Sequence, residues 1–542
     1  MTKILKNLTT KEIGLIFIIF IFTCLQIYFE LRLPDYMQEI TMLVQVPGSQ
    51  MDSIIDAGIL MLGCAFASLI LLILVALLSA RVAANFSFSI RSKIFNKVMS
   101  FSMNEINHFS TSSLITRTTN DITQVQMFIV MGTQMIIKSP LMAAYAIYKI
   151  SGKNFAWTIA TAVAVFILMV IVFICLRLAI PSFKRLQEYT DKINLVAREH
   201  LDGLSVVRAY NAEEYQSNKF EVANKQLTQA NLFTGKVMSL LMPSIQIVNN
   251  GLVLAVYLIG AVLINEAMGI EKLILFSDMV VFSSYAIQVI MSFMMLVMVF
   301  MLAPRASISA KRINEVLETD LSIIYGTTTD ETSSKTGEIE FRNVSFKYPD
   351  AKEYVLKDIS FSAKPGEVVA FIGSTGCGKS TLVNLIPRFY DVSSGEILLN
   401  GINIKEYSKT TLNHLIGYVS QKAILFTGTV NSNVTYGSAV DNNALINSLD
   451  ISQASEFVNN LDKKSDAYVA QDGRNLSGGQ KQRLSIARAI YKNPPFFIFD
   501  DSFSALDYKT DRVLRTALNM VCKNSTRLIV GQRIGTIRDA DK

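Results

Sequence analysis

Long apolar segments, separated by polar connections, dominate the chain as far as residue 303. Each is long enough to cross about 30 Å of hydrocarbon as a helix of about 20 residues. The pattern therefore predicts an all-α membrane domain with six spanning helices. The six segments are Ile13–Leu33, Ile54–Ala80, Phe128–Ile150, Phe155–Ile180, Leu240–Ile264 and Leu273–Ala303.

The polar connections between these segments differ in positive charge. The two long connections, 81–127 and 181–239, contain five and eight Lys or Arg residues. The three short connections, 34–53, 151–154 and 265–272, contain none, one and one. Because positive residues gather on the cytoplasmic side of membrane proteins, the N-terminus and both long connections are predicted to face the cytoplasm.

Both long connections keep a helical spacing of apolar residues. We therefore expect the membrane helices to continue into the cytoplasm before the chain turns back. Candidate turns lie near residues 108–113 in the first connection and within residues 202–215 in the second.

The pattern changes after residue 318. Thr319–Gly337 is rich in Thr, Ser, Asp and Glu, which is typical of a surface linker. Alternating apolar and polar residues from Ile339 to Tyr348 then predict a β-strand. We predict a membrane domain over 1–318, a linker over 319–337 and a soluble domain over 338–542.

A glycine-rich loop stands between an apolar run, Val368–Ile372, and a helical pattern that begins at Leu382. It matches GxxxxGK[ST], in which the glycines let successive backbone amides converge on phosphate oxygens. The lysine supplies charge for the phosphates, and the serine supplies a hydroxyl for Mg²⁺. The soluble domain is thus predicted to be an α/β P-loop NTPase. Its phosphate loop consists of Gly373, Ser374, Thr375, Gly376, Cys377, Gly378, Lys379, Ser380 and Thr381.

Composition agrees with a membrane protein that carries a soluble part. Of the 542 residues, 51% are hydrophobic, which is too many for two ordinary soluble domains. The net charge of +7 is spread along the chain without a basic block, so we do not expect nucleic acid as a partner. The five cysteines are scattered without disulfide or metal spacing.

Two further segments suit a nucleotide. Leu476–Gln480 reads Leu-Ser-Gly-Gly-Gln and opens a helical pattern, so a hydroxyl and glycine amides are available to an anion. The phosphate loop already serves this domain's own nucleotide, so this signature segment indicates contact with another one. Phe496–Asp500 is an apolar strand ending in a carboxylate, as Mg²⁺ coordination beside phosphates requires.

In this order the motifs resemble those of ABC exporters, over nearly the whole chain. The resemblance implies that Tyr348 stacks on adenine and that Gln421 senses the γ-phosphate through Mg²⁺. It implies that Ser504–Asp507 links two ATP sites, and that Leu204–Glu214 carries a short helix docked on an ATPase domain.

The resemblance also implies a head-to-tail dimer in which ATP lies between two ATPase domains. The expected cofactors are ATP and Mg²⁺. The residues expected to contact the partner's ATP are Ser477, Gly478, Gly479 and Gln480, and the expected Mg²⁺ ligands are Ser380, Gln421 and Asp500.

Two positions depart from the family's pattern. After the strand carboxylate the family has a glutamate that polarises the attacking water, and this chain has Asp501. Aspartate is one methylene shorter, whereas general-base catalysis needs an approach of about 2.6 to 3.2 Å. Where the family has a histidine that contacts the γ-phosphate, this chain has Gln532, which cannot carry a positive charge near neutral pH.

We therefore expect a site that holds ATP and hydrolyses it poorly, with Asp501, Gln532 and Asp507 at the catalytic positions. The intact signature segment would complete the site of a second ABC half-transporter. That partner would have glutamate and histidine at the matching positions and an altered signature.

The resulting hypothesis is one subunit of a heterodimeric ABC exporter in the plasma membrane, with N-terminus and ATPase domain in the cytoplasm. Its expected substrates are lipophilic or multidrug-type small molecules, by analogy with the family, and membrane lipid is an expected partner. Two alternatives remain: a homodimeric exporter in which Asp501 is adequate, and an ATP-gated channel or regulatory ABC protein. The family continues past the position of Lys542, so a truncated sequence is expected.

Overall fold

A computed structural model describes residues 2–46, 50–329, 337–349 and 351–542. The chain divides into two compact units. Unit 1 consists of Met1–Asn96 and Ile115–Glu318, and unit 2 of Lys97–Leu114 and Thr319–Lys542. The tip of the first cytoplasmic connection therefore groups with the soluble part of the chain.

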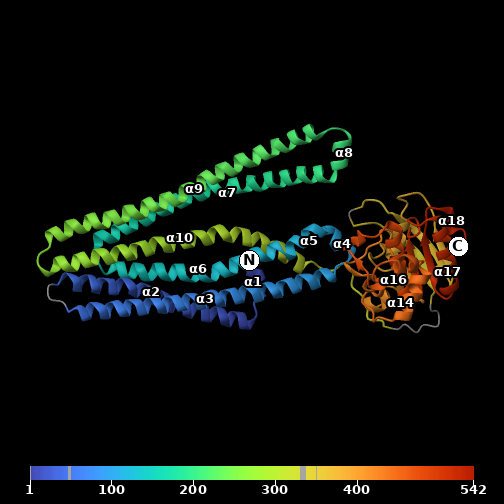
Figure 1. Cartoon of the computed structure of the whole chain (residues 1–542), viewed down its shortest axis with the longest axis horizontal. Helices are drawn as coiled ribbons and strands as arrows, with labels where there is room; N and C mark the ends of the chain where they lie inside the picture. Colours follow the sequence, from blue (N-terminus) through green and yellow to red (C-terminus); the bar gives the residue numbers. More distant parts are fainter. Residues whose placement is uncertain (1, 47–49, 330–336, 350) are drawn as a thin grey trace. The chain divides into compact units, whose positions relative to one another are not determined.

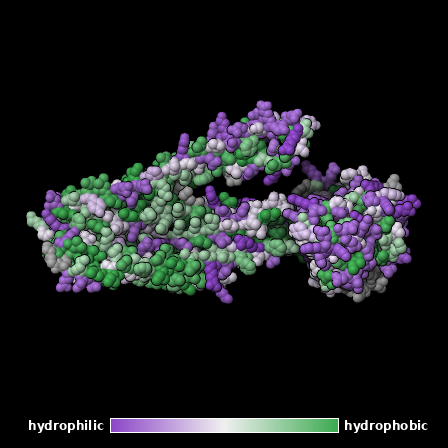
Figure 2. Space-filling view, in the orientation of Figure 1, coloured by the Kyte–Doolittle hydropathy of each residue, from purple (hydrophilic) through white to green (hydrophobic). Residues whose placement is uncertain are grey.

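Unit 1 is built from long helices that run beside one another (Figure 1). Six of the described helices are long and apolar enough to cross a membrane, which confirms the six predicted spans. Figure 2 shows hydrophobic side chains gathered over these helices and hydrophilic ones around α8. The helices are α1 (Thr2–Leu5), α2 (Thr10–Gln45), α3 (Met51–Met99), α5 (Thr111–Thr118), α6 (Asn120–Ser151), α7 (Phe155–Asp202), α8 (Leu204–Ala209), α9 (Glu213–Glu266) and α10 (Ile270–Glu318).

The membrane helices extend beyond their apolar segments, as the sequence predicts for both long connections. Helix α3 continues to Met99, and α7 continues to Asp202. The first connection turns at Ser110, which has a φ of 60° and ends α4 (Met103–Phe109). The second connection turns through α8, inside the predicted range.

Helix α2 is longer than its predicted span, because it passes through Pro34 and continues to Gln45. A proline inside a helix removes one backbone hydrogen bond. A contact with α10 supports the helix around Pro34. The hydroxyl of Tyr285 in α10 donates to the carbonyl of Leu31 at 3.0 Å and lies 2.6 Å from Asp35 Oδ1. The sequence pattern could not show that contact between α2 and α10.

Charged side chains of unit 1 pair with one another, within the helices and at the connection between α6 and α7. Lys149 lies 2.7 Å from Asp35, Lys138 lies 2.8 Å from Glu30, and Lys153 lies 2.5 Å from Asp278. Because an unpaired charge in a membrane is costly, these pairs stabilise the charged side chains of Glu30, Asp35, Lys138 and Lys149 in α2 and α6.

Unit 2 contains an antiparallel sheet and a parallel sheet. The antiparallel sheet has the order β2-β1-β4-β5 and the parallel sheet the order β3-β10-β9-β6, with a separate pair β7-β8. The strands are β1 (Ile339–Phe346), β2 (Leu356–Ala363), β3 (Val368–Phe371), β4 (Ser394–Leu399), β5 (Ile402–Asn403), β6 (Ile416–Val419), β7 (Gly428–Thr429), β8 (Tyr468–Val469), β9 (Phe496–Asp500) and β10 (Thr526–Val530).

Short helices connect these strands, and α4 belongs to the same unit. Their bounds are α11 (Lys379–Leu385), α12 (Lys409–Leu415), α13 (Val430–Thr435), α14 (Asn442–Ile451), α15 (Ser455–Asn459), α16 (Gly478–Tyr491), α17 (Tyr508–Val521) and α18 (Ile534–Ile537), with 3₁₀ turns at Lys464–Asp466 and Gln471–Gly473.

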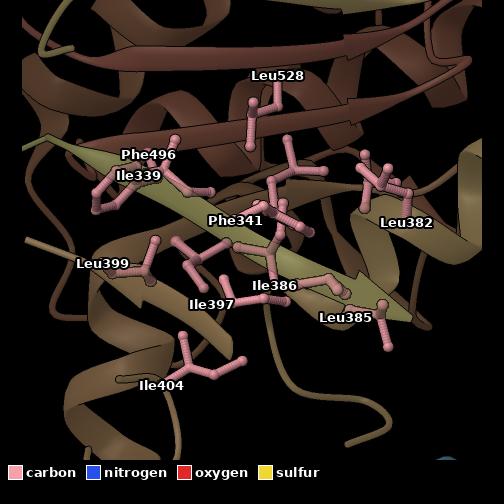
Figure 3. Packing of buried hydrophobic residues seen from close by; sticks show 14 of the residues in the cluster. Ile339, Phe341, Leu382, Leu385, Ile386, Ile397, Leu399, Ile404, Phe496 and Leu528 are labelled. Carbon is pink, nitrogen blue, oxygen red and sulfur yellow. The ribbon is translucent and has the colours of Figure 1, made fainter. Parts of the chain in front are cut away.

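The core of unit 2 holds the start of α11 in place. Every residue of β9 and β10 is buried, as expected for central strands of a parallel sheet that is covered on both faces. Figure 3 shows Phe341 of β1 among Leu382 and Ile386, with Phe496 and Leu528 of the parallel strands nearby. The segment that follows the phosphate loop is therefore anchored by side chains from both sheets.

The predicted linker lies partly outside the described residues, which omit 330–336. The part of the linker before this gap, 319–329, contains an isolated bridge from Thr328 to Tyr407. The side chain of Ile323 is buried, and the guanidinium of Arg388 donates to the carbonyl of Ile324 at 3.0 Å. This part of the linker lies against the soluble unit.

Candidate functional site

Four parallel strands bring distant parts of the sequence to one edge of the sheet. The carboxyl ends of parallel strands lie on the same edge, which is where open α/β sheets bind ligands. Asp500 pairs with Val530, and Val419 pairs with Phe499. Each strand is followed by a predicted site residue: Gly373 after β3, Gln421 after β6, Asp501 after β9 and Gln532 after β10.

The phosphate loop has the backbone that its glycines predict. Gly376 and Gly378 have φ values of 86° and 95°, which favour glycine. A Cβ at Gly378 would come within 3.1 Å of Val355 and Leu356 side chains. The ammonium of Lys379 donates to the carbonyls of Gly373 and Ser374, at 2.8 Å each, so its charge lies over the loop. Residues 373–377 are exposed.

Two oxygen ligands suited to Mg²⁺ lie together at the start of α11. The hydroxyl of Ser380 donates to Asp500 Oδ1 at 2.7 Å, and the Asp500 side chain is buried. Burial raises the pKa of Asp500, and the neighbouring Asp501 carboxylate raises it further, whereas Ser380 and Lys379 act in the opposite direction. A divalent cation would relieve both causes of the rise. Hard oxygen donors in this arrangement fit Mg²⁺.

Asp501 is held by two neutral amides. Its φ is 47°, and its Oδ2 accepts hydrogen bonds from Nε2 of Gln532 at 3.2 Å and from Nε2 of Gln421 at 3.4 Å. The structure thus brings together both positions that depart from the family pattern. Neither amide can donate or accept a full proton near neutral pH.

Tyr348 lies next to the phosphate loop, just past the end of β1. Its hydroxyl is 3.0 Å from that of Thr381, and its ring meets Phe346 edge to face at 5.0 Å. The side chain of Thr381 is buried, so its hydroxyl supports the tyrosine. Sequence reasoning missed Tyr390, whose ring also contacts Tyr348 at 5.3 Å, because no motif distinguishes it from an ordinary core aromatic.

The signature segment caps helix α16. Ser477 Oγ accepts the N–H of Gln480 at 3.3 Å, and Gln480 Oε1 accepts the N–H of Ser477 at 2.9 Å, which makes a capping box. Leu476 is buried beneath it, whereas Ser477 and Gly478 are exposed. Apart from its two chain neighbours and the backbone of its own helix, no described atom lies within 4 Å of the place where a Cβ on Gly478 would stand. The helix therefore presents free glycine backbone to solvent.

The loop Ser504–Asp507 adjoins the signature segment. A Cβ at Gly479 would lie 3.3 Å from the carbonyl oxygen of Ala505. Arg533 donates to the carbonyl of Ser504 at 3.0 Å. Asp507 caps α17 by accepting the N–H of Thr510 at 2.9 Å, and this bonding with Thr510 lowers the pKa of Asp507. In this structure the Asp507 carboxylate therefore acts as the N-cap of α17.

Family models match both parts of the chain. The model described as ABC transporter transmembrane region matches residues 16–293, and that described as ABC transporter matches residues 356–504. An uncharacterized ABC transporter ATP-binding protein of Mycobacterium tuberculosis is 36% identical over 497 residues, which cover 90% of this chain and 84% of that protein.

Two further comparisons extend the similarity. The ATP-dependent lipid A-core flippase of Pseudomonas aeruginosa is 31% identical over 464 residues, which cover 85% of this chain and 76% of the flippase. A solved structure of a bacterial Atm1-family ABC exporter with ATP bound has a TM-score of 0.81 at 21% identity, covering 98% of this chain and 93% of that one. At that identity the structural match concerns the fold.

Proposed function

This chain belongs to the ABC transporter family as an exporter half-transporter, and we propose that it is the subunit of a heterodimer whose own ATP site turns over slowly. Membership of the family makes this chain an ATP-hydrolysing, multi-pass plasma-membrane protein that dimerises and has a cytoplasmic ATPase domain. Within such a dimer, this chain would hold ATP on its phosphate loop and lend its signature segment to the ATP of the partner.

The geometry at Asp501 carries the proposal. The side chain is one methylene shorter than glutamate, which withdraws the carboxylate by about an ångström, and a misplacement of that size can cost about 100-fold in rate. Its Oδ2 is also engaged by Gln421 and Gln532. Gln532 lacks the charge that a histidine could bring to the γ-phosphate. Both changes weaken activation of the attacking water.

Nucleotide binding needs none of the altered groups. Lys379 and the loop amides would hold the phosphates, and Tyr348 would stack on the adenine. Ser380 and Asp500 would supply oxygen ligands to Mg²⁺, with Gln421 nearby. Mg²⁺, when bound, neutralises charge on the phosphate oxygens. The proposed ATP-binding positions therefore keep the family's residues, whereas the positions proposed to activate water do not.

The signature segment supports the second half of the proposal. Its cap is complete and its Gly478 backbone is unobstructed, as contact with an anion on another subunit requires. The partner would then have glutamate and histidine at its own catalytic positions, together with an altered signature. One composite site would turn over, and the other would mainly hold the two ATPase domains together.

Closure of the ATPase domains would reach the membrane helices through the cytoplasmic connections. Val206 in α8 and Tyr210 just after it are 59% and 79% exposed, as expected for a short helix that docks on another ATPase domain. For the substrate we propose lipophilic or multidrug-type molecules. Two observations support a lipophilic cargo: the Pseudomonas aeruginosa relative is a lipid A-core flippase, and Met291 and Met298 of α10 are exposed.

The deciding experiment restores the two departures in the chain by itself. Purified in lipid nanodiscs without a partner, the wild-type chain should bind Mg-ATP and hydrolyse it slowly. An intact signature segment can complete an ATP site when two copies of the chain pair. The Asp501→Glu/Gln532→His variant should therefore gain at least about tenfold in ATPase rate under conditions in which the chain dimerises, and light scattering would measure the dimer. The two single variants serve as controls, and each should gain less. A wild-type chain that is already a vigorous ATPase alone, without gain in the double variant, would contradict the asymmetric model.

A further inference from the structure

Helix α4 of the first cytoplasmic connection belongs to unit 2. The buried carboxylate of Glu105 accepts the N–H of Ser102 at 2.6 Å and the N–H of Ser322 at 3.0 Å. One end of α4 is thereby attached to the segment that follows α10. A cavity of about 150 Å³, lined in part by Asn104 and Tyr390, lies beside this attachment.

Three rings beside the phosphate loop form an aromatic cluster, Phe346, Tyr348 and Tyr390. Tyr348 and Tyr390 meet edge to face, with centroids 5.3 Å apart and planes at 89°. Phe346 lies 5.0 Å from Tyr348 and 5.7 Å from Tyr390. Since Tyr348 is also bound to Thr381 of the phosphate loop, its ring has little freedom to move without displacing Tyr390.

The second attachment of α4 is made to this aromatic cluster. Nδ2 of Asn107 donates to the hydroxyl of Tyr390 at 3.0 Å, across a sequence separation of 283 residues. Tyr390 is half-buried, with its ring in the cluster and its hydroxyl at α4. The Tyr390 side chain thus contacts both Tyr348, the ring proposed to stack on adenine, and the connection that leads to the membrane helices.

We propose that Tyr390 is a positioning residue that relays the stacking of adenine on Tyr348 to the first cytoplasmic connection, through its hydrogen bond with Asn107. This relay rests on the proposed role of Tyr348. It gives the proposed slow ATP site a function that needs no hydrolysis, because a base stacked on Tyr348 would restrict the neighbouring ring of Tyr390. A nucleotide that stays bound would keep α4 in one position.

The expected size of the effect follows from the contact that carries it. One neutral hydrogen bond changes an equilibrium constant by about threefold to tenfold. Coupling between two events is reciprocal. Removal of the hydrogen bond should therefore weaken ATP binding by the same factor by which ATP stabilises the ordered state of α4 in the wild type. A larger effect would indicate damage to the site itself.

The test measures hydrogen exchange in the full-length chain in lipid nanodiscs. Mg-ATP should slow exchange of the amides in residues 103–109 by about threefold to tenfold. Mg-tripolyphosphate, which occupies the phosphate loop without a base, should leave that exchange unchanged. In Tyr390→Phe and in Asn107→Ala the response to ATP should be lost, while exchange in β9 and β10 stays as in the wild type.

A double-mutant cycle separates this relay from a merely structural role. Each single variant should weaken ATP binding by about threefold, and the double variant should be no weaker than either, because both remove the same bond. Tyr468→Phe, which removes an exposed hydroxyl elsewhere in unit 2, is the matched control. Equal responses to ATP and tripolyphosphate, a response retained in Tyr390→Phe, or additive losses in the cycle would each overturn the relay. Absence of ATP binding in the wild type would overturn the proposed function itself.

Discussion

The signature segment and the position of Asp501 both belong to the nucleotide sites of ABC exporters. This chain keeps the family's residues at the signature segment and departs from them at Asp501. At the signature segment the capping box is complete and Gly478 is unobstructed. At Asp501 a shortened carboxylate is shared by the amides of Gln421 and Gln532. The part that would act on the partner's ATP is preserved, whereas the part that would act on this chain's own ATP is altered.

This difference teaches that binding and hydrolysis make separate demands on one domain. Phosphate binding depends on backbone amides, a lysine and a packed helix, which the core of unit 2 supplies. Hydrolysis depends on the reach of one carboxylate to within hydrogen-bonding distance of water. A single methylene can therefore remove the second function and leave the first intact.

A negative charge on the signature segment should have the largest effect on the ATPase rate. Gly478→Asp should lower the ATPase rate of the exporter, purified from its own cells through a tag on this chain, by about 100-fold. The new carboxylate would repel the partner's nucleotide where a backbone amide should stabilise it, and such a donor contributes a factor of this order. Because no described atom outside the neighbouring residues and the backbone of the same helix lies within 4 Å of the new Cβ, the fold should survive, which circular dichroism can verify.

Asn442→Asp is the matched control for that variant. It adds the same charge at the first residue of α14, another helix of unit 2. Its ATPase rate should stay within about twofold of the wild type. A normal rate in Gly478→Asp would mean that the signature segment does not complete a working site.

The second challenge addresses the binding region. Tyr348→Ala should weaken ATP binding to the chain by about tenfold, because stacking of a base on an aromatic ring contributes about 1–3 kcal/mol. Titration with a fluorescent ATP analogue would measure the change. Tyr348→Trp should bind ATP nearly as well as the wild type, since it keeps an aromatic face. Equal loss in both variants would argue against a stacking role.

The sequence predicted the parts of this site that are local in the chain. Apolar length predicted the six spans, and the order of a strand, a glycine loop and a helix predicted the placement of Lys379 and Ser380. Sequence alone could not predict the contact between Asn107 and Tyr390, because it joins residues 283 positions apart and follows no motif. Nor could it predict that α2 would continue past Pro34, since the support comes from Tyr285 on a distant helix.

A third, smaller effect is expected at Cys377. This thiol is exposed in the phosphate loop, with its sulfur 3.7 Å from the ammonium of Lys379. Mg-ATP should slow its alkylation by maleimide about fivefold, because phosphates would occupy the surrounding loop. The buried Cys522 serves as an internal control that stays unlabelled in both conditions. Equal labelling of Cys377 with and without Mg-ATP would count against its place in the nucleotide site.

The smallest expected effect is the most informative about asymmetry. In the exporter purified from its own cells, Asp501→Asn should change the ATPase rate by less than about threefold. In the asymmetric model the replaced carboxylate belongs to the slower site, and the asparagine side chain keeps nearly the same size and one acceptor oxygen for Gln421 or Gln532. In a symmetric enzyme the same change removes the base of both sites and should cost about 100-fold. The magnitude therefore separates the two models directly: a loss near 100-fold would show that Asp501 is the working base, and Gln532→Ala would then be expected to slow turnover as well.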